Sequence, residues 1–329
     1  RVIINSGKIS NKGWEISVSG VPVKVKNFEW KTIFNWSKNN SMVESLPEGI
    51  DKIQIGSGVY NVKSYAEVGK PYGAIYAKTF KRDAEGYILC QLDGSPKEGQ
   101  DYEYLGCVQA DWRGGWNNVF RLGNFSFSVM FDFQKGGKFF SQTSIQSSVD
   151  GQSVKSLEGR DADFFSRKIL GESDEERYGF MRPQNANTPT ANGQIYPDWG
   201  RPKGVVLPNC RYDEDVEGLA GQQVLGYCTP ERYWMHYTSR DISRFIYDAS
   251  YVKLREITVS YDLPKKWLRK TPFQTFRVAA VGRNIATLFA NTPHGLDPQA
   301  TSTTGNAQGF ERGFNLPSAT YGFDIKVSF

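Results

Sequence analysis

The sequence predicts an all-β fold, an antiparallel transmembrane β-barrel of which this chain supplies about nine strands. The first observation is that several segments of about ten residues alternate between apolar and polar side chains, as strands do between lipid and a wet lumen. The second is the aromatic content of 14%, which suits the aromatic girdles of a barrel. The third is that short and long connections alternate along the chain, as they do at the two rims of an outer-membrane barrel.

The alternation is clearest in the terminal stretch, which ends on Phe329. Its apolar positions share one face of a strand, and its polar positions share the other. The apolar positions are Tyr321, Phe323, Ile325, Val327 and Phe329. The same pattern occurs in "NKGWEISVSG", "NFEWKTIFNW", "GNFSFSVMFDFQ" and "REITVSYDLP". Together the segments predict strands at 9–20, 23–37, 59–68, 72–82, 115–122, 124–134, 250–262, 273–285 and 315–329, of which the pair within 59–82 alternates least.

The connections predict two different rims. Short turns are expected near Gly20 to Val23, Gly69 to Tyr72, and Gly123 to Asn124. Long extracellular loops are expected at about 39–58, 83–114, 136–249 and 286–314, and loops of this length are usually functional. Because single-chain bacterial barrels have an even number of strands and an open edge cannot face lipid, we expect another polypeptide or an N-terminal part to supply further strands.

Composition excludes several classes of protein. The net charge of +5 comes without a basic run, so we expect no nucleic-acid partner. Two histidines and no CxxC pair make zinc improbable, and no catalytic constellation marks an enzyme. The acidic stretch Asp213 to Gly218 either binds calcium through its carboxylates or is a solvated loop. Two disulfides and buried free thiols are both open for the cysteines, which are Cys90, Cys107, Cys210 and Cys228.

Several stretches resemble the C-terminal barrel half of SusC/RagA-type TonB-dependent outer-membrane transporters. Each is weak alone, and together they follow the family's order over nearly the whole length. They are "NSGKISNKGWEISVSGVPV", "NFEWKTIFNWSKNNSMVESL", "EVGKPYGAIY", "NFSFSVMFDFQKGGKFFS", "DASYVKLREITVSYDLPKKWL", "FRVAAVGRNIATLF", "GLDPQA" and "YGFDIKVSF".

The resemblance implies a longer protein with a barrel of 22 strands in the bacterial outer membrane. A plug domain and a TonB-contacting segment are expected N-terminal to Arg1, and a SusD-like surface lipoprotein is expected on the extracellular loops. Such an assembly imports oligosaccharides or peptides and needs no cofactor of its own. The terminal strand with Phe329 resembles the signal read by the barrel-assembly machinery, and the outer face of the barrel contacts outer-membrane lipid.

Aromatic side chains in the predicted long loops are the candidates for contact with substrate or with the lid protein. They are Trp112, Trp199, Tyr212, Tyr233, Trp234 and Tyr237. The alternative is that they form the core of the loops or a girdle at the rim. Polar positions facing the lumen are candidates for plug contacts, namely Asn124, Asp132, Gln134, Glu256, Asp262, Asp324 and Lys326.

Two other functions remain compatible with the alternation. A soluble secreted β-protein, such as a lectin-like sandwich, also buries one face of each strand, and it would purify without detergent. A passive porin or adhesin barrel has the same strands but neither a plug nor a dependence on TonB.

Overall fold

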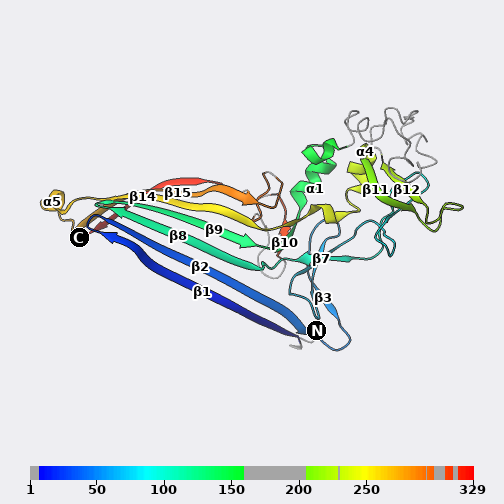
Figure 1. Cartoon of the computed structure of the whole chain (residues 1–329), viewed down its shortest axis with the longest axis horizontal. Coiled ribbons are helices and arrows are strands. Elements are labelled where there is room, and N and C mark those ends of the chain that lie inside the picture. The colour runs from blue at the N-terminus through cyan, green and yellow to red at the C-terminus, as the bar shows by residue number, and fades with distance from the viewer. Residues whose placement is uncertain (1–6, 159–204, 229, 294, 300–307, 314–317) are drawn as a thin grey trace.

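The computed structural model describes residues 7–158, 205–228, 230–293, 295–299, 308–313 and 318–329. Its largest element is a seven-stranded antiparallel sheet, called here the barrel sheet, which forms the long arm of the molecule (Figure 1). In sheet order it contains β1 (Lys8–Val25), β2 (Phe28–Ser45), β8 (Trp112–Leu122), β9 (Phe125–Lys135), β14 (Tyr251–Asp262), β15 (Thr275–Ala290) and β17 (Thr320–Ser328). The predicted antiparallel fold is thereby confirmed.

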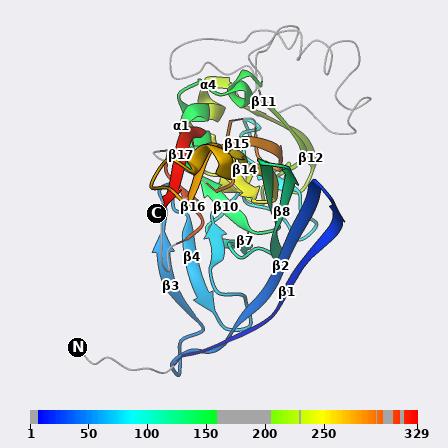
Figure 2. The same cartoon turned by 90° about the vertical axis from the view of Figure 1, so that its left-hand side faces the viewer.

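The barrel sheet is open and curved, with β1 and β17 at its two edges (Figure 2). The short turn predicted near Gly20 to Val23, in the first hairpin of this sheet, is wrong. Gly20 to Val23 is a register shift inside β1, and the chain reverses at Lys26 and Asn27 instead. Glycine and proline there mark a bulge, which breaks the ladder without ending the strand.

The predicted strands at 59–68 and 72–82 do not belong to the barrel sheet. They contribute to a separate four-stranded sheet of β3 (Lys52–Ser57), β4 (Lys63–Glu67), β5 (Ala74–Ala77) and β7 (Glu103–Cys107). All four residues of β5 are buried, which explains why this region shows so little alternation. The described part of the barrel sheet therefore has seven strands and not nine.

One face of the barrel sheet is apolar and exposed. The register places Val18 opposite Phe34, Phe34 opposite Trp116, and Trp116 opposite Phe131, so apolar residues form continuous rows across four strands. Phe323 on β17 is 87% exposed. An apolar face of this size on the outside of a curved sheet is the surface that lipid covers in an outer-membrane barrel.

The chain between the barrel strands folds into a compact region, called here the loop layer, at the end of the sheet away from α5 (Lys265–Leu268) (Figure 1). Two further sheets lie in it, β13 (Ile246–Asp248) with β10 (Lys138–Ser141) and β16 (Phe310–Glu311), and β12 (Gln223–Cys228) with β11 (Val205–Tyr212) and β6 (Ile88–Cys90). The layer also contains α1 (Gln142–Val149), η1 (Val154–Leu157), α4 (Pro230–Arg232), η2 (Tyr233–Tyr237) and η3 (Ile242–Phe245). No helix in the described ranges is both long and apolar enough to cross a membrane.

Candidate functional site

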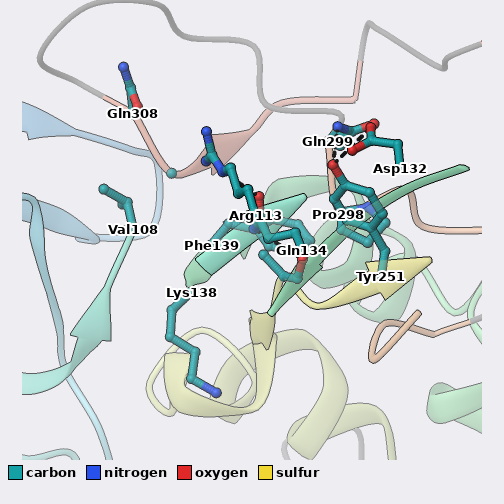
Figure 3. A pocket seen from close by; sticks show the side chains of 12 residues that line it. Val108, Arg113, Asp132, Gln134, Lys138, Phe139, Tyr251, Pro298, Gln299 and Gln308 are labelled. Carbon is teal, nitrogen blue, oxygen red and sulfur yellow. Dashed lines mark hydrogen bonds between the residues drawn. The ribbon is translucent and has the colours of Figure 1, made fainter. Parts of the chain in front are cut away.

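A cavity of about 400 Å³ lies where the polar face of the barrel sheet meets the loop layer (Figure 3). Strands β8, β9 and β14 supply one wall, and β10 with residues 298–299 and 308–309 supplies the rest. The polar side chains that line it are Arg113, Asp132, Gln134, Lys138, Tyr251, Gln299 and Gln308. A polar cavity at the mouth of a barrel is a natural position for a ligand.

Strand register brings these side chains together. Arg113 on β8 pairs with Gln134 on β9, and Gln134 pairs in turn with Tyr251 on β14. Asp132 lies two residues before Gln134, so both side chains project from the same face of β9. The cavity wall is therefore a patch of the polar face that the alternation predicts.

A hydrogen-bonded network surrounds Asp132. Its carboxylate accepts hydrogen bonds from the hydroxyl of Tyr251 at 3.2 Å and from Nε of Arg255 at 3.1 Å, and Nη2 of Arg255 contacts the same oxygen. Arg255 also donates to Oε1 of Gln299 at 2.7 Å, and Nε2 of Gln299 donates to the hydroxyl of Tyr251 at 2.5 Å. The closed loop of contacts fixes Tyr251 and Gln299 in the cavity wall (Figure 3).

A buried lysine ties the segment at 297–299 to the sheet. Lys253 is 5% exposed, and its ammonium donates to both carboxylate oxygens of Asp297 at 2.5 and 2.6 Å. It also donates to Oε1 of Gln299 at 2.9 Å. Because an unpaired charge is expensive to bury, this pair holds the segment against the cavity.

The turn that follows β9 closes another side of the cavity. Gly136 and Gly137 have φ of +73° and +84°, a conformation that favours glycine. The backbone N–H of Gly136 donates to Oγ of Ser250 at 2.8 Å. Lys138 then lies 3.3 Å from the carboxylate of Asp248. Burial alone would raise the pKa of Asp248, but hydrogen bonds from the hydroxyl and N–H of Ser250 dominate and lower it to about 2.

A second cavity, of about 300 Å³, shares Arg113 with the first. Trp112, one of the predicted contact residues, lines it together with Ser37, Asn39 and Gln109. The ring of Trp112 meets that of Phe133 edge-on, with centroids 5.9 Å apart. Trp112 is thus the predicted aromatic residue that the structure places at a cavity, and its contact with substrate stays a prediction.

Four of the other aromatic candidates are buried in the core of the loop layer. Tyr212, Tyr233 and Trp234 are each 1% exposed and Tyr237 is 3% exposed. They belong to one hydrophobic cluster with Val205, Val216 and Val224. Their rings pack against the chain itself, which favours the alternative that they form the core of the loops, and their contact with substrate or a lid protein stays a prediction. Trp199 lies outside the described residues.

The acidic stretch and the cysteines also have structural partners in the loop layer. Asp213 is 2% exposed, and its carboxylate pairs with Lys81 at 2.9 Å and Lys97 at 2.8 Å. The carboxylate of Asp213 is thus paired within the chain, and calcium binding by the stretch Asp213 to Gly218 stays a prediction. The four cysteines are thiols, and the thiol of Cys90 hydrogen-bonds to Cys210.

The terminal strand β17 is an edge of the barrel sheet. It pairs with β15 on one side, and its apolar residues stay exposed on the outer face. The ring of Phe329 contacts that of Phe273 beside α5, with centroids 5.3 Å apart. The reading of this strand as an assembly signal stays a prediction.

Several residues of the cavity are not found by reading motifs. Alternation places Asp132 and Gln134 on the lumen face, whereas Lys138, Tyr251 and Gln299 have no sequence signal of their own. For Arg113 the usable signal is its parity, since it alternates with Trp112 and Gly114 at the start of a strand.

Comparisons with known proteins agree with this architecture. No protein-family model matches the chain. The chain is 24% identical over 97% of its length to TonB-dependent receptor P3 of Formosa agariphila, and 22% identical over 41% of its length to TonB-dependent receptor P39 of the same bacterium. It covers 28% and 18% of those proteins, so it spans less than a third of each.

The solved structures that resemble it are of the RagAB peptide importer. Its "open-open" state matches 98% of this chain with a TM-score of 0.54 and 15% identity, and its "closed-closed" state matches 99% with a TM-score of 0.56 and 16% identity. The chain covers 29% and 30% of those chains.

The fold and the relatives together indicate part of a β-barrel of the bacterial outer membrane that is similar to TonB-dependent receptors. Within that class, the resemblance to TonB-dependent transporters of the SusC/RagA type is confirmed: the barrel sheet and the loop layer have that type's fold. Its relatives are receptors and importers rather than enzymes.

Proposed function

We propose that the protein containing this chain imports oligosaccharides or peptides across the outer membrane with energy supplied through TonB. The observation that carries this proposal is the match to a TonB-dependent receptor over 97% of the chain. The cavity between the lumen face and the loop layer supports it, because a ligand held there lies at the entrance to the barrel.

The proposed assembly has two further parts. A plug domain fills the barrel and contacts TonB, and a SusD-like lipoprotein covers the loop layer from outside. The loop layer supports the second part, since it is a folded surface with its own hydrophobic cores and not a set of loose connections.

The test uses the full-length protein in its own bacterium. Uptake of labelled short peptides and oligosaccharides is measured in the wild type, in a strain without the gene, and in a strain without TonB. We expect uptake of one ligand class to fall to background in both mutant strains. Uptake that needs the gene but not TonB would indicate a passive porin instead.

The lid is tested separately by purifying the tagged full-length protein in mild detergent. We expect one lipoprotein to copurify in a fixed ratio. Purification of the transporter alone, from cells that show TonB-dependent uptake, would contradict the two-component assembly.

A further inference from the structure

Arg113 differs from the other charged side chains that line the 400 Å³ cavity. Asp132 is paired with Arg255, and Lys138 is paired with Asp248. Within the part of the chain that the structure describes, no carboxylate lies within 4 Å of the Arg113 guanidinium. The cavity therefore carries one positive charge that its own walls do not neutralise.

Among the described residues, the Arg113 guanidinium makes its hydrogen bond to the protein through Nε. Nε of Arg113 donates to Oε1 of Gln134 at 2.9 Å. Gln134 is itself anchored, because its Nε2 donates to the backbone carbonyls of Gly136 at 3.2 Å and Ala249 at 3.1 Å. The two terminal nitrogens of Arg113 remain directed into the space between the labelled side chains (Figure 3). Arg113 is exposed there, so a ligand can reach it.

The sequence between two of the residues that line the cavity contains no acidic side chain. Gln299 and Gln308 both line the cavity, and residues 300–307 connect them. That connection reads ATSTTGNA and contains neither aspartate nor glutamate. These eight residues therefore supply no carboxylate to Arg113.

We propose that Arg113 binds a carboxylate group of the transported ligand in this cavity. The proposal rests on the proposed import function and narrows its substrate class to anionic oligosaccharides or peptides. A planar carboxylate matches the two free N–H directions of a guanidinium, and hydrogen bonds between charged groups are stronger than neutral ones. A hydroxyl or a neutral amide in the same position would leave the arginine charge partly desolvated without compensation.

The bound carboxylate can belong to a peptide or to an acidic oligosaccharide, and the experiment distinguishes the two. The probes are tetraalanine with a free or an amidated C-terminus, and trigalacturonate as the free acid or the methyl ester. Their binding to the purified full-length protein in detergent is measured by calorimetry, for the wild type and for Arg113→Gln. We expect one free acid to bind the wild type at least about tenfold more tightly than its blocked form, and Arg113→Gln to abolish that preference.

Two variants control the result. Arg113→Lys keeps the charge but not the fork, so we expect it to retain part of the preference. Arg121→Gln removes the same charge from the same face of β8, eight residues and about 27 Å along the strand. We expect Arg121→Gln to preserve the preference fully.

The outcomes distinguish this inference from the proposed function. Equal binding of free and blocked probes by the wild type, no binding of either acid, or a preference that survives Arg113→Gln would overturn the carboxylate site. TonB-dependent uptake of the blocked probes would leave the import function standing in that case. Uptake of every probe without TonB would overturn the import function itself.

Discussion

At the scale of single residues, burial in the loop layer decides what a polar or aromatic side chain does. Asp213 shows this for charge. Burial alone would raise its pKa, but hydrogen bonds from Lys97 and Lys81 dominate and lower it to about 2. Asp248 beside the cavity has a pKa of about 2 through its hydrogen bonds with Ser250. Both carboxylates are therefore stabilised in the ionised form.

These two carboxylates make the loop layer acid-sensitive. Their pKa values in the folded state lie below the unfolded value of 3.8, so their contribution is complete above that value and is lost as pH falls toward 2. Hydrogen exchange over residues 205–228, measured in the full-length protein between pH 5 and pH 2.5, checks this. We expect protection to fall with pH in the wild type and to depend less on pH in Asp213→Asn. The same pH dependence in both proteins would contradict it.

Trp234 gives a second expectation at this scale. Because its ring is buried and its indole N–H donates to the carbonyl of Glu158 at 3.1 Å, Trp234→Ala should destabilise the loop layer by about 3–5 kcal/mol. Protease sensitivity of the loop layer is the measurement. The neighbouring Met235 is 51% exposed, so Met235→Ala is a matched control with a change within about 0.5 kcal/mol. Reduced ligand affinity of Trp234→Ala with unchanged protease resistance would instead support the predicted contact of Trp234 with substrate.

At the scale of elements, the sequence predicts the strands with one lipid face and one wet face. The segments at 115–122, 124–134 and 250–262 correspond closely to β8, β9 and β14. Alternation does not predict strand β5, because β5 is buried on both faces and has no polar side. Gly20 is misread as a turn because a bulge and a turn use the same residue types.

The candidate site is less predictable than the strands. Alternation places Asp132 on the lumen face, but it cannot reveal that Arg255 neutralises this residue while Arg113 has no carboxylate partner among the residues that the structure describes. That difference depends on a bulge between Leu254 and Glu256 and on the distant segment at 297–299. Pairings between residues so far apart in sequence leave no local pattern to read.

The two faces of β17 give an expectation at this scale. Phe323 lies on the exposed apolar face and Asp324 on the opposite face of the same strand. Near the bilayer midplane, Phe323→Arg should lower the stability of the folded barrel by about 2–4 kcal/mol. Asp324→Arg, on the lumen face, should be tolerated. Heat-dependent gel mobility of the full-length protein in outer membranes reports correct assembly. Equal assembly of the two variants would argue against lipid on the Phe323 face.

At the scale of the whole molecule, a few contacts join distant parts of the chain. Glu311 is 3% exposed and accepts hydrogen bonds from the hydroxyls of Ser141 at 2.5 Å and Thr143 at 2.6 Å. These residues precede Glu311 by about 170 positions. The carboxylate also accepts from the backbone N–H of Thr143 at 3.2 Å, so it joins β16 to the start of α1.

Removing the carboxylate of Glu311 should loosen the loop layer without unfolding the barrel sheet. Glu311→Ala should lower the stability of the loop layer by about 1–3 kcal/mol, because buried hydrogen-bond donors lose their acceptor. Glu311→Gln still accepts hydrogen bonds, so we expect a smaller loss of stability. Hydrogen exchange should rise together in residues 138–149 and 308–313. A rise confined to one of these segments would show that Glu311 does not couple them.

The parallel pairs β10 with β16 and β6 with β11 also constrain the order in which the molecule forms. The hairpins of the barrel sheet join neighbours in sequence, so they can form as soon as both strands are available. The parallel pairs can form only after segments far apart in the sequence have come together. Until Phe310 reaches Phe140, that core lacks one of its fully buried rings. Formation of the loop layer is therefore the slow, aggregation-exposed stage of folding, because it depends on contacts between segments far apart in the sequence.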